Sequence, residues 1–425
     1  MKILYNIFIK LYPLVAKLIS HKNAKAKLWI EGRKNIFTEI QQALKENKQN
    51  IVWMHCSSLG EFEQGRPVLE KLKLLYPNYT FLLTFFSPSG YEAQKKYPHA
   101  DWIFYMPMDS AHNAKKFLDI INPVLVLFVK YEYWYYYLTE LNKRKIPLLL
   151  ISGIIRKEQP FFKWYGGLYR KMLQCFTHIF VQDKNCVELL QQIGYTKNIS
   201  IGGDTRFDRV LEIADKFEPI ELVEKFIGHN KVIVAGSTWT DDDEVMAHYA
   251  NTHTEVKFII APHEIEKERL NECLMFYKNA ILFSDLQNSL TDITTTKSAL
   301  QNPNVLIIDN IGMLSRLYQY ATICYVGGGF GDDGVHNVLE AAVFKKPVIF
   351  GPEFSKYREA VELNDAKGSC SVHSALELEK ILNQLFEDEI LYTTTATNAA
   401  NYVVSKSGAT ATVIEYIYEK RLLTN

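Results

Sequence analysis

Two glutamates follow apolar segments at places where the chain is expected to turn. Glu61 lies shortly after the apolar run 51–55, and Glu132 lies among aromatic residues after the run 124–129. A carboxylate at the mouth of a ligand site can act as a general base. Ser58 and Glu61 also fit a capping box, and Glu132 fits a partly exposed glutamate at a helix start. Each glutamate therefore has a catalytic and a structural interpretation.

A second set of residues has the chemistry of an anion or nucleotide site. Ser237 and Thr238 end an apolar run and precede an acidic segment, so amides at the start of the next helix would bind a phosphate. The alternative is that either hydroxyl is a plain helix cap. Three glycines at 327–329 allow close approach of a ligand, and Asn337 and Glu340 would share a helix face on which the glutamate holds a ribose.

The glycine spacing is neither that of a GxGxxG dinucleotide site nor that of a Walker loop, which disfavours hydride transfer and ATP hydrolysis.

The segments that must position these residues alternate between short apolar runs and longer amphipathic ones. The strand-like runs are 51–55, 79–85, 124–129, 148–151 and 178–181, then 231–235, 258–260, 305–308, 323–326 and 348–350. This succession predicts an α/β protein with two doubly wound, Rossmann-like domains, each built on a parallel sheet. Ligands of such sheets bind beyond the carboxyl ends of the strands, so we expect the site in the strand-to-helix turns of a cleft between the domains.

The predicted organisation has five parts. They are an amphipathic segment at 1–30, a first domain at 31–205, a polar linker at 206–230, a second domain at 231–405 and a C-terminal helix at 406–425.

The amino terminus has the pattern of an interfacial helix. Its apolar residues recur at helical spacing, and its only charged residues in positions 1–20 are Lys2, Lys10 and Lys17. This favours attachment to a membrane surface, with a helix packed on its own domain as the alternative. Pro13 is expected to kink the helix, and no apolar run is long enough to span a bilayer.

Composition narrows the classes of partner. The 425 residues include 48 Lys plus Arg and 48 Asp plus Glu, so no global basic field favours nucleic acid as a partner. The six cysteines are scattered, which supports neither a disulfide framework nor a metal site.

Taken in chain order, these motifs resemble the bacterial 3-deoxy-D-manno-octulosonic acid (Kdo) transferases of lipopolysaccharide synthesis. The motifs are Ser-Leu-Gly-Glu-Phe at 58–62, Ser-Pro-Ser-Gly at 87–90, Glu-Tyr-Trp at 132–134, Gly-Asp-Thr-Arg-Phe-Asp at 203–208, Gly-Ser-Thr at 236–238, Gly-Met-Leu at 312–314, Tyr-Val-Gly-Gly at 325–328, His-Asn-x-x-Glu at 336–340 and Gly-Pro at 351–352. The resemblance covers nearly the whole chain.

The resemblance implies a GT-B fold and an inverting transfer of Kdo from CMP-Kdo to a lipid A precursor (lipid IVA). It implies no cofactor and no divalent metal, and a peripheral location at the cytoplasmic face of the bacterial inner membrane. Glu61 would be the catalytic base, and Glu132 would belong to the same acceptor side. Acceptor-binding residues would be Ser58, Gly60, Ser87 and Gly90. Donor-binding residues would be Arg206, Ser237, Thr238, His263, Gly312, Met313, Leu314, Gly327, Gly328, Gly329, Asn337 and Glu340.

This chain departs from the family's usual sequence at two places near the expected donor site, and Arg206 has two interpretations. Where the family commonly has Pro-Arg-His, this chain has Pro-His-Glu at 262–264, so His263 is expected to replace a phosphate-binding arginine, together with Lys267 or Arg269. Trp239 stands where the family has a histidine. Arg206 either binds the phosphate or the Kdo carboxylate through its bidentate guanidinium, or forms a salt bridge in the linker.

Two other functions remain open on the sequence. One is another membrane-associated GT-B glycosyltransferase with a UDP-sugar donor, and the other is a non-catalytic nucleotide-sugar sensor.

Overall fold

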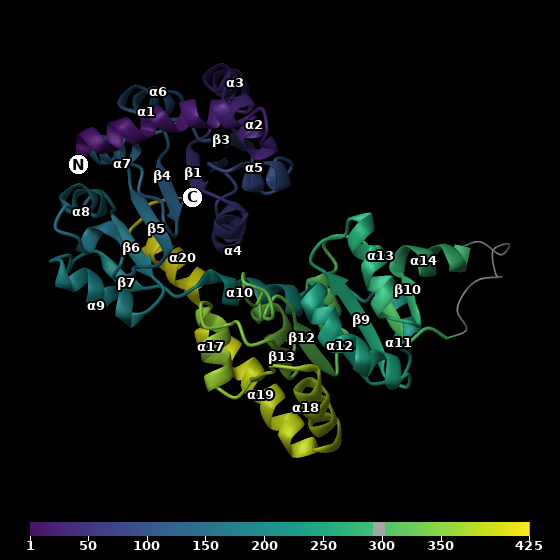
Figure 1. The fold of residues 1–425 in the computed structure, drawn as a ribbon. Coiled ribbons are helices and arrows are strands. Elements are labelled where there is room, and N and C mark those ends of the chain that lie inside the picture. The colour runs from purple at the N-terminus through teal and green to yellow at the C-terminus, as the bar shows by residue number, and fades with distance from the viewer. Residues whose placement is uncertain (292–301, 425) are drawn as a thin grey trace. The chain divides into compact units, whose positions relative to one another are not determined.

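The computed structural model of the chain describes residues 1–291 and 302–424 (Figure 1). The chain forms two compact units, here called unit 1 (Met1–Arg209 with Ser407–Asn425) and unit 2 (Val210–Lys406). Among the described residues, each unit contains a seven-stranded sheet whose paired strands are all parallel. The prediction of two doubly wound α/β domains is confirmed.

The sheet of unit 1 has the strand order β3-β2-β1-β4-β5-β6-β7. Its strands are β1 (Ile51–Cys56), β2 (Thr80–Phe85), β3 (Trp102–Tyr105), β4 (Leu125–Val129), β5 (Leu148–Gly153), β6 (His178–Val181) and β7 (Ile199–Ile201). In the centre, Trp53 of β1 pairs with Leu82 of β2 on one side and Val126 of β4 on the other. The carboxyl ends of β1, β2 and β4 therefore lie side by side.

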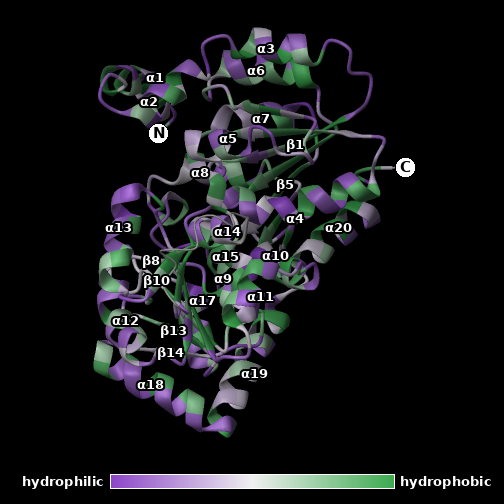
Figure 2. Cartoon of the chain, turned by 90° about the vertical axis from the view of Figure 1, so that its right-hand side faces the viewer, coloured by the Kyte–Doolittle hydropathy of each residue, from purple (hydrophilic) through white to green (hydrophobic). Residues whose placement is uncertain are grey.

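Helices cover both faces of this sheet. They are α1 (Lys2–Ile19), α2 (Ala24–Glu31), α3 (Ile36–Ala43), α4 (Leu59–Leu75), α5 (Pro88–Gln94), α6 (Ala111–Ile121), α7 (Tyr135–Lys143), α8 (Gly167–Leu173), α9 (Lys184–Gln192), α10 (Thr205–Asp215), which continues into unit 2, and α20 (Ala409–Glu419). One core packs Trp53 against Phe117 of α6 and Tyr137 of α7. The strands of both sheets are predominantly hydrophobic, as strands buried on both faces require (Figure 2).

The sheet of unit 2 has the strand order β10-β11-β9-β8-β12-β13-β14. Its strands are β8 (Val232–Thr238), β9 (Lys257–Pro262), β10 (Ala280–Leu282), β11 (Val305–Ile307), β12 (Ile323–Val326), β13 (Val348–Phe350) and β14 (Ser369–Ser371). Its helices are α11 (Glu221–Ile227), α12 (Thr240–Thr252), α13 (Lys267–Phe276), α14 (Phe283–Thr291), α15 (Leu314–Leu317), α16 (Leu339–Ala342), α17 (Arg358–Asp365), α18 (Ala375–Glu387) and α19 (Glu389–Lys406). Met246 of α12 and Leu382 of α18 belong to one core with β8 and β9.

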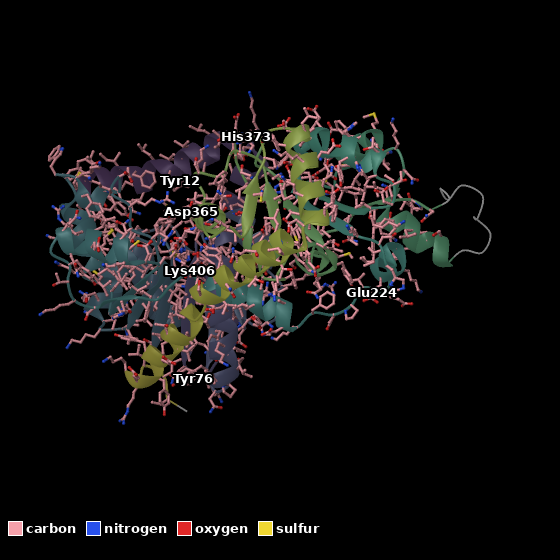
Figure 3. All side chains as sticks on the ribbon, turned by 90° about the horizontal axis from the view of Figure 1, so that it is seen from below. Tyr12, Tyr76, Glu224, Asp365, His373 and Lys406 are labelled. Atoms are coloured by element: carbon pink, nitrogen blue, oxygen red, sulfur yellow. The ribbon has the colours of Figure 1, made fainter. Side chains whose placement is uncertain are left out.

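The segment predicted as a linker contains most of α10 and all of α11. Helix α10 runs across the boundary between the units, which lies between Arg209 and Val210. After α19, which ends at Lys406 (labelled in Figure 3), the chain returns to unit 1. The carboxylate of Asp208 accepts hydrogen bonds from the backbone amides of Gly408 and Thr410, both at 2.6 Å. These bonds anchor the start of α20, whose Val413 and Ile417 are buried in the core beneath α4.

Helix α1 lies on unit 1 through one narrow face. Ile9 and Ala16 are buried, the hydroxyl of Tyr5 donates to Asp109, and the ring of Tyr12 (Figure 3) packs on Trp29. The helix is continuous through Pro13. Within the described part of the chain, no helix combines the length and apolar character needed to cross a bilayer.

Candidate active-site residues in the two units

Glu61 lies in the first turn of α4, directly beyond the carboxyl end of β1, and is half-buried. The hydroxyl of Ser58 donates to Oε2 of Glu61, whereas no capping bond forms from the Ser58 side chain to the helix backbone. The predicted capping box is therefore wrong, because Ser58 uses its hydroxyl on the carboxylate instead of accepting an amide. Oε1 of Glu61 has no hydrogen-bond partner among the described residues.

Glu132 is buried, with 1% of its surface exposed, and does not fit the expectation of a partly exposed glutamate. Its Oε1 accepts from the amide of Ser57 at 2.9 Å, and its Oε2 accepts from Nε1 of Trp134 at 2.5 Å. Nε2 of His55 lies 3.2 Å from the same Oε2. Because β1 and β4 are neighbours, this carboxylate joins the ends of both strands and holds the turn that leads to Glu61.

His55 is a site residue that sequence reasoning did not single out. It is completely buried, and its Nδ1 lies 2.9 Å from Oγ1 of Thr84 on β2. The sequence contains one signal for it, which is a titratable side chain inside the otherwise apolar run of β1.

The turn after β2 joins the same group. The amide of Ser87 donates to the carbonyl of Ser57 at 2.7 Å, so the predicted acceptor residues Ser58, Gly60 and Ser87 lie in two linked turns. Gly90 is different, because the position of a Cβ there is occupied by the ring of Phe85. Packing alone accounts for the glycine at this position.

In unit 2, the next-to-last residue of β8, Ser237, is left-handed with φ 55°, shortly before the chain enters α12. The N-cap of α12 is Trp239, whose amide donates to the Asp242 carboxylate at 2.9 Å. The expectation that Ser237 or Thr238 caps this helix is wrong, because the helix begins two residues later than Thr238. Thr238 is buried, and Ser237 is half-buried at the end of the strand.

Asp242 organises the glycine turn after β12. Its carboxylate accepts from the amide of Gly328 at 2.8 Å and from the Tyr325 hydroxyl at 2.7 Å. Burial raises the pKa of Asp242, and the two backbone donors from Gly328 and Trp239 oppose that rise. This role of Asp242 could not be predicted from the sequence, because Asp242 is one of four consecutive acidic residues at 241–244.

The glycines at 327–329 are required by the chain itself. A Cβ at Gly327 would meet the backbone of Ser237, and a Cβ at Gly329 would lie 2.6 Å from the amide of Gly351. Gly328 has φ 88°, in the left-handed region that favours glycine. Close contact between turns therefore explains these residues without a ligand.

Three rings cluster at the same edge of unit 2. The ring centroids of His263 and His336 are 4.4 Å apart, and those of Trp239 and His263 are 4.7 Å apart. Nε1 of Trp239 donates to Nε2 of His336 at 3.0 Å. Burial, followed by the charge of His263, lowers the pKa of His336 to about 4. His336 is thus neutral near pH 7, while His263 is exposed.

The remaining donor candidates lie in turns of unit 2. Asn337 donates to Glu340 at 2.8 Å, although α16 begins only at Leu339, so the two residues do not share a helix face as expected. Gly312 has φ 94° and precedes Met313, the N-cap of α15. The side chain of Leu314 occupies space that a Cβ at Gly236 would need.

The basic residues expected near the phosphate differ in their partners. Arg269 is buried and paired with Asp243, and it also bonds Glu272 at 2.9 Å. Lys267 is exposed. Arg206 belongs to unit 1 and forms a salt bridge with Asp204 at 2.8 Å, as the alternative interpretation had it.

Residues 32–209 match the family model described as 3-deoxy-D-manno-octulosonic-acid transferase. This segment is a Kdo transferase family domain. The chain is 28% identical to the 3-deoxy-D-manno-octulosonic acid transferase of Aquifex aeolicus over 81% of this chain and 88% of that protein. It is 26% identical to the 3-deoxy-D-manno-octulosonic acid transferase of Rickettsia typhi, over 79% of this chain and 71% of that protein.

A further relative is a longer protein. The bifunctional glycosyltransferase/methyltransferase of Fusobacterium nucleatum is 30% identical over 71% of this chain, and the match spans 47% of that protein.

The fold is of the GT-B type, as its structural neighbours show. The UDP-GlcNAc 2-epimerase of Neisseria meningitidis superposes with a TM-score of 0.62 at 17% identity, covering 87% of this chain and all of that one. A glycosyltransferase of Rickettsia africae superposes with a TM-score of 0.54 at 16% identity, covering 89% of this chain and all of that one.

Proposed function

We propose that this Kdo transferase relative moves Kdo from CMP-Kdo to a lipid A precursor with inversion at the anomeric carbon. The observation that carries the proposal is the Glu61 turn. It lies within the family segment at 32–209, at the carboxyl end of the central strand β1, and its glutamate keeps one carboxylate oxygen without a protein partner among the described residues.

In the proposed reaction, Glu61 takes the proton from a sugar hydroxyl of the acceptor. The hydroxyl oxygen then bonds to the anomeric carbon of Kdo from the face opposite to the phosphate. The bond between that carbon and the phosphate oxygen breaks, and its electron pair leaves with CMP. A carboxylate with one free oxygen suits this role, because a general base must reach the proton directly.

Glu132 and His55 have a positioning role in this scheme. Both side chains are buried, and the hydrogen bond from Ser57 to Glu132 fixes the backbone two residues before α4 begins. Rigid support of this kind holds a base in its productive geometry. Both carboxylate oxygens of Glu132 already accept hydrogen bonds from the protein, so neither is free to take the acceptor proton.

Unit 2 supplies groups for the negative charge that develops on the departing phosphate. Because Nε2 of His336 accepts from Trp239, a neutral His336 carries its proton on Nδ1 and retains one donor. His263 adds an exposed imidazole beside it. We propose that this pair replaces the arginine the family commonly has, while Asn337 and Glu340 hold the ribose.

We further propose that transfer needs no divalent metal. Two aspartates of the α12 first turn, which follows Ser237 and Thr238, are already bound by the protein: Asp242 by the amide of Gly328 and Asp243 by Arg269. Among residues 1–291 and 302–424, no group of three His, Cys, Asp or Glu side chains has the geometry to hold a metal. Amides and imidazoles can stabilise the phosphate charge instead.

Attachment to the cytoplasmic face of the inner membrane is part of the proposal, and α1 supports it. The helix exposes a wide apolar surface, formed by Ile3, Leu4, Ile7, Phe8, Leu11, Leu14, Val15, Leu18 and Ile19. Lys2, Lys10 and Lys17 are its only charged side chains. Apolar burial combined with lysines near anionic lipid gives reversible, salt-sensitive binding.

The test is an assay with radiolabelled CMP-Kdo and a lipid A precursor, in which the product is identified by mass, with and without EDTA. The expected result is a Kdo-bearing product that forms equally in both conditions. Transfer from a UDP-sugar instead would establish the alternative donor class. Binding of CMP-Kdo without turnover would establish a sensor and overturn the proposal.

A further inference from the structure

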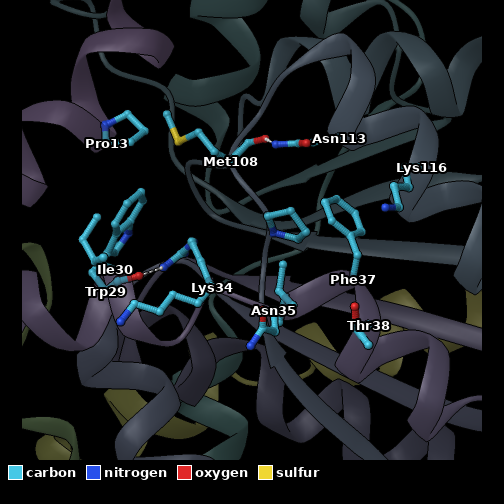
Figure 4. Close-up of a pocket in the computed structure, with 13 residues that line it drawn as sticks. Pro13, Trp29, Ile30, Lys34, Asn35, Phe37, Thr38, Met108, Asn113 and Lys116 are labelled. Carbon is cyan, nitrogen blue, oxygen red and sulfur yellow. Dashed lines mark hydrogen bonds between the residues drawn. The ribbon is translucent and has the colours of Figure 1, made fainter.

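A cavity of about 510 Å³ lies on unit 1 between α1, α2, α3 and α6 (Figure 4). Its lining includes three basic side chains, Arg33, Lys34 and Lys116, and no carboxylate. Asn35 and Asn113 also line it, and the side-chain amide of Asn113 donates to the carbonyl of Met108 at 2.9 Å. The cavity therefore has the chemistry of an anion site.

Arg33 is the unusual member of this lining. Its guanidinium donates to three backbone carbonyls, those of Met106 at 2.9 Å, Trp29 at 3.1 Å and Phe86 at 2.7 Å. It lies 4.1 Å from the Trp29 ring centroid and 4.7 Å from that of Tyr105, and it pairs with no carboxylate among the described residues.

Burial lowers the pKa of Arg33 to about 9. Arg33 is half-buried, and a charge with so little access to water and no counter-ion is costly, so an anion in the adjoining cavity would reduce that cost.

A second cavity, of about 300 Å³, lies between α1, α2 and the start of α5, and it shares Trp29 with the first. Its lining is largely apolar and includes Val15, Ala16 and Ile19 of α1 and Pro88 of α5. Nε1 of Trp29 is buried and has no acceptor. A basic cavity and an apolar cavity thus meet at one tryptophan.

We propose that the two cavities together bind one phosphate-bearing lipid of the bilayer. Its phosphate lies in the basic cavity beside Arg33, and one acyl chain lies in the apolar cavity beside α1. Helix α1 lines both cavities, through Pro13 and Val15, and exposes its apolar surface next to them. The proposed lipid is a component of the bilayer that the transfer does not consume, although the apolar cavity also includes Ser87, which the resemblance assigns to the acceptor.

The first experiment titrates the full chain with dihexanoyl phosphatidylglycerol below its micelle concentration, by calorimetry. We expect saturable binding of one molecule. Lys34→Gln combined with Lys116→Gln should weaken the affinity by about tenfold or more. The matched control is Lys184→Gln with Lys197→Gln, which removes the same charge from residues that line neither cavity.

Equal weakening in both double variants would show unspecific charge attraction and overturn the proposal, as would unchanged binding in both. Thermal melting of each variant checks that the fold is retained.

The second experiment separates a lipid from a free anion. Ala26→Phe places a ring in the apolar cavity and should weaken binding of the phospholipid by about tenfold, while binding of glycerol 3-phosphate stays unchanged. Wild-type protein should also prefer the phospholipid to glycerol 3-phosphate. Equal affinity for the two ligands would show that the apolar cavity contributes nothing and would overturn the lipid assignment.

Discussion

At the scale of single residues, Glu61 and Glu132 show how surroundings separate two similar side chains. Both follow a strand of the same sheet at its carboxyl end. Glu61 is half-buried with Oε1 free among the described residues, whereas both oxygens of Glu132 are occupied and the residue is 1% exposed. A base needs access to its proton, so the geometry favours Glu61 for chemistry and Glu132 for support.

Replacing Glu61 tests this division directly. Glu61→Gln keeps the shape and can still accept from Ser58, but it loses the basic oxygen, so turnover should fall by roughly 10²–10⁴-fold. The measurement is single-turnover transfer, with CMP-Kdo binding as the control, since that binding is assigned to unit 2.

A Gln variant that turns over within a few fold of wild type would contradict the base assignment. Thermal melting separates a catalytic loss from a folding defect, because Glu61 is half-buried and the change keeps its shape, so the free energy of unfolding should alter by no more than about 0.5 kcal/mol.

His336 predicts a specific dependence of stability on pH. Its folded pKa is lowered to about 4, against an ordinary value near 6.5, by burial and by His263, with Asp333 opposing. The unfolded chain therefore binds more protons between these values, and the free energy of unfolding should fall as pH drops through that window.

Urea unfolding of wild type and His336→Gln at several pH values measures this effect. The variant keeps a polar side chain that can accept from Trp239 but cannot become an imidazolium. Its stability should decline less steeply than that of wild type below pH 6.5. Identical slopes would show that His336 titrates normally in the folded protein.

At the scale of elements, the link between α12 and the glycine turn decides how unit 2 presents its donors. Removing the carboxylate in Asp242→Ala leaves the buried amide of Gly328 without a partner. The expected loss is about 1–3 kcal/mol of stability and about tenfold or more in CMP-Kdo affinity.

Asp241→Ala is the matched control for this substitution, since Asp241 stands in the same first turn but is exposed. Calorimetric binding of CMP-Kdo and urea unfolding should both remain near wild type for Asp241→Ala. Equal losses of affinity and stability in the two variants would mean that negative charge in the first turn of α12 causes both effects, and that the contact with Gly328 does not.

The exposed surface of α1 can be tested without removing the helix, whose Tyr5 and Ile9 belong to unit 1. Phe8→Gln, Leu11→Gln and Leu18→Gln together should abolish flotation with vesicles of phosphatidylcholine and phosphatidylglycerol, because the helix loses apolar area at the interface.

A control triple, Met275→Gln, Leu376→Gln and Ile390→Gln, changes apolar residues of unit 2 that are at least as exposed, and it should float like wild type. Flotation of wild type should also weaken as salt rises. Undiminished flotation of the α1 triple would place the membrane contact elsewhere.

At the scale of the whole molecule, the last helix of the chain completes the first unit. Ile417 of α20 is fully buried in the core that contains Leu72 of α4. Ile417→Ala should therefore lower the free energy of unfolding by about 2–5 kcal/mol. Its neighbour Tyr418 is 74% exposed, and Tyr418→Ala should cost no more than about 0.5 kcal/mol.

Urea unfolding followed by circular dichroism distinguishes these outcomes. A small effect of Ile417→Ala would show that α20 contributes little to unit 1.

The sequence by itself determined the central strands, the two α/β domains and the order of motifs that resembles the Kdo transferases. These features are local, because a buried parallel strand is a continuous apolar run, and a motif is read along the chain. The strands it did not predict are β3, β7, β10 and β14, which are the outer strands of the two sheets. Each of them is only partly buried, whereas β11 and β13, which are no longer, are wholly buried, so burial separates the missed strands from the predicted ones better than length does.

Only the tertiary structure decided which side chains support the site. Glu132 meets Ser57 across 75 residues of chain, Asp242 meets Gly328 across 86, and Arg33 meets the carbonyl of Met106 across 73. The sequence did not predict these contacts, because they depend on which strands are neighbours and on the exact register between them. Strand order and register arise from packing of the whole sheet, so no local pattern encodes them.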